Sequence, residues 1–279
     1  MNLIFLRIAI FLYVLATAGQ IAHLVTLKDG VRKVANWLTA AAFAAHTVVL
    51  FVRFFEAGYT PVTSLHESLS FFGWCVVGLF LLFQLRYSLP SIGAFATPVA
   101  LLMLIGAAST SGAINALPPA LQSLWLPVHT IVLFVSYGAF ALAAVVGVMY
   151  LLQERQLKRK RLGALFHRLP NLDVLDEISY RCLTIGFPTL TFGIITGAAW
   201  ANSAWGTYWS WDVKETWSLI TWFLYAGLLH GRFTIGWRGK RAAWWSIVGF
   251  GAVIFTFLGV NYVLPLIIPG VESLHIYGG

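Results

Sequence analysis

The sequence has little charge and very little cysteine. Charged residues make up 10% of the chain and leave no polar stretch long enough to form a soluble domain with its own core. The two cysteines, Cys75 and Cys182, each lie in or beside an apolar run, and there is no C-x-x-C pair, so thiol–disulfide chemistry is not expected. The phosphate-binding motif G-x-x-x-x-G-K-[ST] is also missing, which argues against ATP-driven transport by this chain alone.

Apolar residues are abundant instead, at 59% of the chain. This composition is typical of polytopic membrane proteins. No small-residue cleavage site follows the first apolar run, so we read it as a retained helix and not as a signal peptide. We predict an all-α polytopic membrane protein, one integral-membrane domain over residues 1–279 with about eight transmembrane helices, near residues 3–25, 36–55, 68–86, 90–107, 128–152, 182–201, 217–235 and 243–267.

The basic residues predict the orientation of these helices. If the eight spans are correct, all but Arg7, Arg53 and Lys214 among the 18 Lys and Arg residues fall on one side. Basic loops stay in the cytoplasm, so both termini are predicted on the outer (periplasmic) side of a bacterial cytoplasmic membrane. The net charge of +8 is confined to a few loops and is not a nucleic-acid footprint. In the longest loop, residues 153–180, we expect a basic half along the anionic lipid surface and a short amphipathic helix capped by Asn171.

A tryptophan segment at residues 200–230 is predicted to lie on the outer side. It contains six of the 12 tryptophans, together with the charged run W-D-x-K-E. Tryptophan favours the membrane–water boundary, so the segment is either an aromatic belt or a platform for a flat amphipathic ligand. Likewise, Asp212, Lys214 and Glu215 either bind the ligand or apoprotein or form a turn that satisfies its own charges.

Two histidines share this predicted compartment. His129 begins the fifth predicted helix, and His275 lies in the C-terminal tail. Two neutral imidazoles beside an aromatic shelf are what six-coordinate haem iron accepts. Haem propionates would need cations or N–H donors, which Lys214 or Arg53 can supply.

The remaining histidines are expected to play different parts. We expect His23 and His46 to hydrogen-bond a neighbouring helix, and His66 to be solvated in a loop. His230 closes the tryptophan-rich helix near the cytoplasmic face, opposite Arg232. Because an ionisable group inside a membrane is usually functional, His230 is a further candidate.

Several segments of the sequence resemble those of a known family. WGTYWSWDVKETWSLITWFLYAGLLH, at residues 205–230, is similar to the WWD signature of the cytochrome c assembly family, which includes CcsA/ResC, CcmC and CcmF. PVTSLHESLSFFGW at 61–74, VHTIVLFVSY at 128–137, and GVNY with LHIYG at 259–278 resemble segments of the CcsA/ResC branch. The resemblance covers nearly the whole chain. The sequence departs from the branch at Ser64, at His66 where tyrosine is usual, and in a longer spacer before the tail histidine.

The resemblance implies haem b as the cofactor. It implies His129 and His275 as axial ligands of haem iron, and His230 as part of a second haem position on an export route. The second histidine of that position would come from a CcsB/ResB-like membrane subunit, which this chain does not contain. The other residues assigned to haem binding lie in the WWD segment: Trp205, Trp209, Trp211, Asp212 and Trp217.

The expected function is therefore the haem-binding and haem-exporting subunit of a holocytochrome c synthase. Such a subunit would present haem for thioether attachment to the C-x-x-C-H segment of an apocytochrome c, beside a thioredoxin-like thiol-reducing partner. No residue resembles a catalytic nucleophile or general base, so this chain would be an enzyme only as part of that complex. Three alternatives remain open: a HemX-type regulator of tetrapyrrole synthesis that docks a partner on its basic loop, a haem exporter without a ligation role, and a transporter of another flat ligand.

Overall fold

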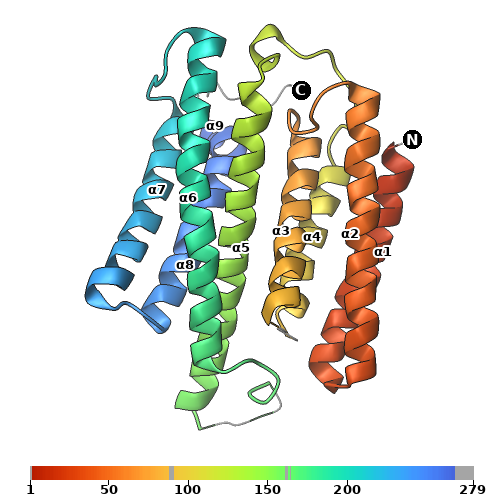
Figure 1. Ribbon diagram of the computed structural model, residues 1–279, viewed down its shortest axis with the longest axis vertical. Coiled ribbons are helices and arrows are strands. Elements are labelled where there is room, and N and C mark those ends of the chain that lie inside the picture. Colours follow the sequence, from red (N-terminus) through yellow and green to blue (C-terminus); the bar gives the residue numbers. More distant parts are fainter. Residues whose placement is uncertain (1, 88–90, 161–162, 164, 268–279) are drawn as a thin grey trace. The chain divides into compact units, whose positions relative to one another are not determined.

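The computed structural model describes residues 2–87, 91–160, 163 and 165–267 (Figure 1). Over these residues all regular structure is helical, and helices occur at each of the eight predicted positions. The principal helices are α1 (Asn2–Thr26), α2 (Asp29–Ala57), α3 (Leu65–Tyr87), α4 (Gly93–Ala108), α5 (Trp125–Lys158), α6 (Leu172–Trp205), α7 (Val213–His230) and α8 (Lys240–Ile254). Shorter helical segments are η1 (Pro119–Leu121), the π-helices η2 (Gly231–Ile235) and η3 (Phe255–Val263), and α9 (Leu264–Ile267).

Six helical segments in the described part of the chain are long and apolar enough to cross a membrane. They are α1, α2, α3, α5, α6 and the continuous segment Lys240–Ile267, while α4 is a shorter apolar helix. The prediction of an all-α polytopic membrane protein is confirmed. At 1.5 Å per residue, the 34 residues of α5 extend about 51 Å, well beyond a hydrocarbon layer of about 30 Å. The end of α5 therefore projects past the apolar layer.

The predicted separate helix after Asn171 is wrong. These residues form the first turns of α6, which continues without a break to Trp205. The predicted cap is nevertheless present, because the side-chain oxygen of Asn171 accepts a hydrogen bond from the main-chain N–H of Val174 at 2.9 Å.

The chain folds into two compact units. Unit 1 contains α1 to α4 together with Leu152–Val174, and unit 2 contains Ala116–Leu151 and the helices from Leu175 onward. Each unit is described by itself below. The two cysteines are buried free thiols, Cys75 in unit 1 and Cys182 in unit 2, as expected of inert core residues.

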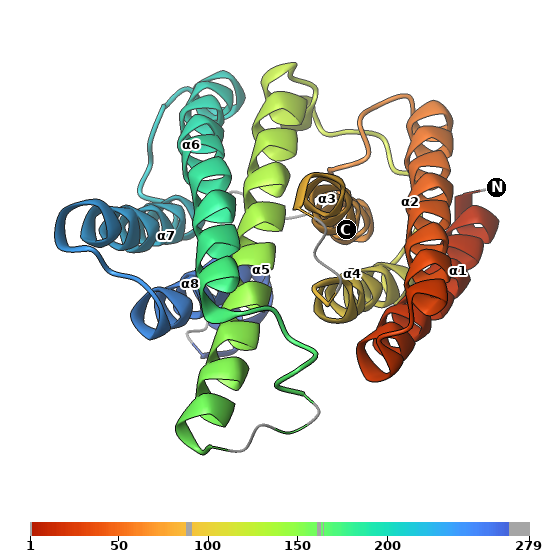
Figure 2. The ribbon, with the colours of Figure 1, turned by 60° about the horizontal axis from the view of Figure 1, so that its bottom comes forward.

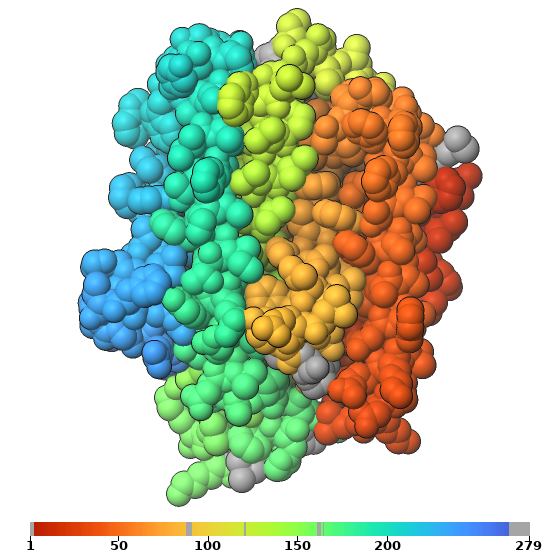
Figure 3. All heavy atoms as spheres, viewed as in Figure 1, coloured from red at the N-terminus to blue at the C-terminus, as the bar shows by residue number. Residues whose placement is uncertain are grey.

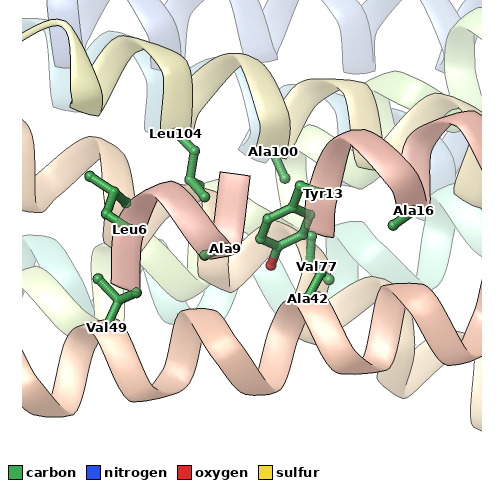
Figure 4. Packing of buried hydrophobic residues seen from close by; sticks show 9 residues of the cluster. All are labelled: Leu6, Ala9, Tyr13, Ala16, Ala42, Val49, Val77, Ala100 and Leu104. Carbon is green, nitrogen blue, oxygen red and sulfur yellow. The ribbon is translucent and has the colours of Figure 1, made fainter. Parts of the chain in front are cut away.

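In unit 1, α1 packs along α2 and also contacts α4 (Figures 1 and 2). Small residues allow the close approach, since a β-carbon added to Gly19 would lie 3.3 Å from the α-carbon of Ala35. The apolar core shown in Figure 4 is formed by Leu6, Ala9, Tyr13, Ala16, Ala42, Val49, Val77, Ala100 and Leu104.

The opposite face of α2 carries large apolar side chains. Trp37 and Phe55 are 76% and 77% exposed, and Phe51 is 60% exposed. Figure 3 shows α2, in orange, on the surface of the molecule. A water-facing helix would not present such a face, whereas a lipid-facing helix would.

In unit 2, glycines bring α6 close to α5. A β-carbon added to Gly186 would lie 2.5 Å from Phe140, and one added to Gly193 would lie 2.4 Å from Leu133. The α6 glycines therefore lie in close contact with α5. On the other side of Phe140, the ring of Tyr225 from α7 stacks at 3.5 Å between centroids.

Candidate functional site

The candidate site lies at the end of unit 2 where α5 begins, α6 ends and α7 begins, which we call the tryptophan end. His129 lies near the start of α5, and its Nδ1 is 2.7 Å from the carbonyl oxygen of Gly193 on α6. Its ring stacks on Trp200, with 5.9 Å between centroids and 22° between planes. Gly197 makes room for the ring, since a β-carbon there would lie 2.5 Å from Cε1 of His129.

This hydrogen bond determines the tautomer of His129. A carbonyl oxygen can only accept, so Nδ1 of His129 carries the proton and donates it to Gly193. In a neutral imidazole the lone pair then lies on Nε2, the nitrogen that would coordinate a metal. Metal-binding histidines in proteins are commonly oriented by such a hydrogen bond from the other ring nitrogen.

Tryptophans of the segment contact one another near this histidine. Trp205, the last residue of α6, packs edge-on against Trp200 at 5.0 Å, and Trp200 in turn stacks on His129. These three aromatic residues form one connected cluster, as a ligand platform would require. Trp209 and Trp211 form a second edge-on pair at 5.8 Å, in the connection between α6 and α7.

Two other tryptophans serve the packing of α7. Trp217 contacts Phe255 of η3, with 4.2 Å between ring centroids. Trp222 donates its indole N–H to the hydroxyl of Thr191 on α6, at 2.9 Å. These contacts fix the start of α7 beside α6 and the π-helix.

Trp211 has an unusual backbone conformation. Its φ angle is +60°, in the left-handed region, and its side chain is 69% exposed. A bulky residue pays about 1–2 kcal/mol for this conformation. Strained backbone of this kind clusters at functional sites, and haem binding by Trp211 remains a prediction.

The turn after Trp211 satisfies its own polar groups. Asp212 caps α7 by accepting from the N–H of Lys214 at 2.8 Å, and Glu215 accepts from the N–H groups of Asp212 and Ser210 at 3.1 and 2.8 Å. This reciprocal capping box accounts for both carboxylates. A direct ligand role for Asp212 remains a prediction.

Lys214 is half-buried at the first turn of α7. Desolvation lowers the pKa of its ammonium group from 10.5 to about 8, although the nearby charge of Asp212 acts in the opposite direction. Lys214 therefore keeps its positive charge at neutral pH, in a place where the charge is poorly solvated.

The other predicted cation, Arg53, is engaged elsewhere. Its guanidinium is buried in unit 1, where Nε donates to Glu67 at 2.8 Å and Nη1 and Nη2 donate to the carbonyl oxygens of Gly112 and Ala113. Its predicted role as a partner of propionates is therefore wrong. The same Glu67 accepts from the N–H and hydroxyl of Thr63, so the ion pair ties two connecting segments together.

His230 ends α7 and its side chain is exposed. It is followed by the π-helix η2, a rare conformation that is often found at functional sites. We expected Arg232 to lie opposite His230. Instead, Arg232 forms a bidentate pair with Asp176 of α6 at 2.6 and 3.0 Å and lies over the ring of Tyr180. His275 lies outside the described residues.

The other histidines behave differently from one another. His46 is buried and hydrogen-bonds Ser70 at 3.0 Å and Tyr13 at 3.4 Å, as predicted. The prediction is wrong for His23, which is buried with both ring nitrogens lacking a partner among the described residues. It is also wrong for His66, which is buried at the start of α3, with Nδ1 donating to the carbonyl of Ala107 at 2.8 Å.

The glycines around His129 were not identified as site residues from the sequence. Gly193 and Gly197 are spaced four residues apart, which predicts close helix contact but not what the neighbouring helix presents. A histidine on the facing turn of a neighbouring helix is the additional signal that would have pointed to them.

Comparisons with known proteins show the family of the chain. The family model described as Cytochrome C assembly protein matches residues 36–268. The CcsA cytochrome c biogenesis protein of Gloeobacter violaceus is 34% identical, with 98% of this chain and 93% of the relative covered. The CcsA protein of Synechococcus elongatus is 37% identical, with 86% and 85% covered.

A solved structure shares the fold. The protein titled Cytochrome c Heme Lyase CcmF is 18% identical with a TM-score of 0.71, and the match covers 92% of this chain but 46% of CcmF. This likeness shows that the two proteins share a helical fold. The chain belongs to the cytochrome c assembly family, and the curated relatives named above are CcsA proteins.

Proposed function

We propose that this chain is a haem-binding subunit of the machinery that matures cytochromes c in a bacterial cytoplasmic membrane. Its tryptophan end would face the periplasm and hold haem b for attachment to the C-x-x-C-H segment of an apocytochrome c. The observation that carries the proposal is His129, whose Nδ1 donates to Gly193 while its ring stacks on Trp200. Membership of the cytochrome c assembly family supports it independently.

The donors at the tryptophan end suit haem. A neutral imidazole with its lone pair on Nε2 is an axial ligand that haem iron accepts. Gly197 keeps the imidazole in place without crowding it, and Lys214 supplies a poorly solvated positive charge for carboxylates. His275 is proposed as the second axial ligand.

The bound haem would supply two vinyl groups, to which the two cysteine thiols of the apocytochrome add to form thioethers. The contribution of this chain is positional. His129 and the Trp200–Trp205 pair would fix the ligand against α6, and exposed Trp211 would cover it from the connection before α7. Holding reactants in place lowers a barrier by removing the entropy cost of bringing them together.

His230 is proposed to belong to a second haem position on the route of export. Its exposure at the end of α7 makes it accessible to a partner. A CcsB/ResB-like membrane subunit would supply the opposite histidine, and a thioredoxin-like protein would keep the apocytochrome thiols reduced.

Absorption spectra of the purified protein test the proposal. We expect wild type to bind a low-spin haem, and His129→Ala and His275→Ala to lose it or turn high-spin. His167→Ala is the matched control, because His167 is an exposed residue of the basic loop and should behave as wild type. If wild type binds no haem, or if the two ligand variants match it, the proposal fails and a HemX-type regulator becomes the better explanation.

A further inference from the structure

Asn261, in the π-helix η3, has an amide group with unmet hydrogen-bonding needs. Its side-chain nitrogen and oxygen are both shielded from solvent, and neither has a hydrogen-bond partner among the residues that the structure describes. Each buried polar atom left in this state is costly, so native proteins usually provide a partner or leave the place to a bound ligand or water. Thr256, on the same π-helix, shows the usual outcome, because its hydroxyl donates to Ala252 at 2.8 Å.

The packing of α5 against α8 and η3 places Asn261 at the level of His129. A β-carbon added to Gly147 would lie 2.9 Å from the carbonyl oxygen of Ala243, and the rings of Phe134 and Phe257 meet at 5.6 Å. These two contacts define antiparallel helices in register. Moving along α5 from Phe134 toward the start of the helix leads to His129. Moving the same way along η3 leads from Phe257 to Asn261, so His129 and Asn261 lie at the same height on the two helices.

The start of α7 reaches the same level. Tyr225 packs on Gly249 of α8, and Trp217 packs on Phe255, so α7 and this helix are also antiparallel. Continuing from Trp217 toward the beginning of α7 reaches Lys214. A cation, an unsatisfied amide and the candidate iron ligand thus lie at one level, on three helices of unit 2.

We propose that the Asn261 amide binds a carboxylate of the tetrapyrrole held at the tryptophan end. The amide N–H would donate to a carboxylate oxygen, and Lys214 at the same level would compensate its charge. This inference rests on the proposed function and adds to it the residue that would orient the ligand. A carboxylate suits the position because a buried anion needs both a hydrogen-bond donor and a nearby positive charge.

Comparing haem with its dimethyl ester tests the inference. Both are titrated into detergent-purified wild type, Asn261→Leu and Thr256→Val, and binding is followed by the low-spin absorption band. We expect wild type to prefer haem over the diester by about tenfold, the typical effect of a hydrogen bond to a charged group. Asn261→Leu should lower that preference to the part that Lys214 supplies while binding the diester as wild type does, which also shows that it has folded.

The controls separate the possible outcomes. Thr256→Val removes a polar group from the same π-helix and should keep the wild-type preference for haem. The inference is overturned if Asn261→Leu retains the full preference, or if it loses both ligands equally, since the amide would then have only a structural role. If wild type binds neither compound, the proposed function itself fails and the inference falls with it.

Discussion

Replacing Gly197 by alanine tests whether the position of His129 matters. A β-carbon at residue 197 would lie 2.5 Å from Cε1 and 2.7 Å from Nδ1 of the His129 ring. Ordinary van der Waals contact begins at 3.4 Å, so the ring would have to move by about 0.9 Å. The ring is held by its hydrogen bond to Gly193 and by its stacking on Trp200.

The size of the effect follows from these contacts. Adding a displacement of about 0.9 Å to the 2.7 Å separation between Nδ1 and the Gly193 oxygen can bring it past the hydrogen-bonding limit. Losing a hydrogen bond of this kind costs about 0.5–1.5 kcal/mol, and overpacking costs a further 1–3 kcal/mol or so. We therefore expect Gly197→Ala to weaken haem binding by about tenfold or more.

Haem titration of the purified protein, with a thermal melt of the ligand-free form, measures both effects. Gly227→Ala on α7 is the matched control, because a β-carbon there meets nothing within 4 Å. The control should bind haem as wild type and melt at the same temperature or slightly higher, since alanine favours helix over glycine. If Gly197→Ala and wild type had equal affinities and equal spectra, the position of the His129 ring beside Gly197 would not matter for haem binding.

Three further predictions concern other residues. Asp176→Ala leaves the Arg232 guanidinium buried without its partner and should lower the free energy of unfolding by about 3 kcal/mol. Glu177→Ala breaks an exposed pair and should lower it by less than about 1 kcal/mol, and thermal melts of both variants check the difference. Because the pKa of Lys214 is lowered from 10.5 to about 8, the unfolded chain binds more protons between these values and native stability rises with pH across them. Lys214→Met should therefore be more stable than wild type at pH 7, and melts from pH 7 to 10.5 should show the difference shrinking above pH 8. Trp211→Gly should raise the melting temperature, because glycine accepts the positive φ angle, but should weaken haem binding; a loss of both would contradict the strain argument.

Much of the fold could be predicted from the sequence because a bilayer imposes simple requirements. Long apolar runs located a helix at each of the eight predicted positions. The limits of α6 were wrong because the acidic turn at residues 171–177 is polar, and hydropathy cannot tell a helix that projects past the membrane from a separate surface helix.

The candidate site could be predicted only in outline. The WWD segment and His129 were recognised from the sequence, but the two interactions that prepare His129 depend on a main-chain carbonyl and on a missing β-carbon. The carbonyl leaves no trace in the residue types, and the glycines indicate that a neighbouring helix comes close but not that it presents His129. The unsatisfied amide of Asn261 is similar, since asparagine in a sequence gives no sign of whether its hydrogen bonds are made.

Arg53 and Lys214 show why long-range partners limit sequence-based assignment. Both were isolated cations predicted on the same side of the membrane, so they looked equivalent as partners for a ligand carboxylate. Arg53 is neutralised by Glu67, which lies on the next helix and comes close to it only in the folded unit. The acid next to Lys214 is Asp212, whose carboxylate caps α7 by accepting from the main-chain N–H of Lys214 itself. The acid that acts on Lys214 is therefore two residues away in the sequence, whereas the acid that pairs with Arg53 can be identified only once α2 and α3 are packed.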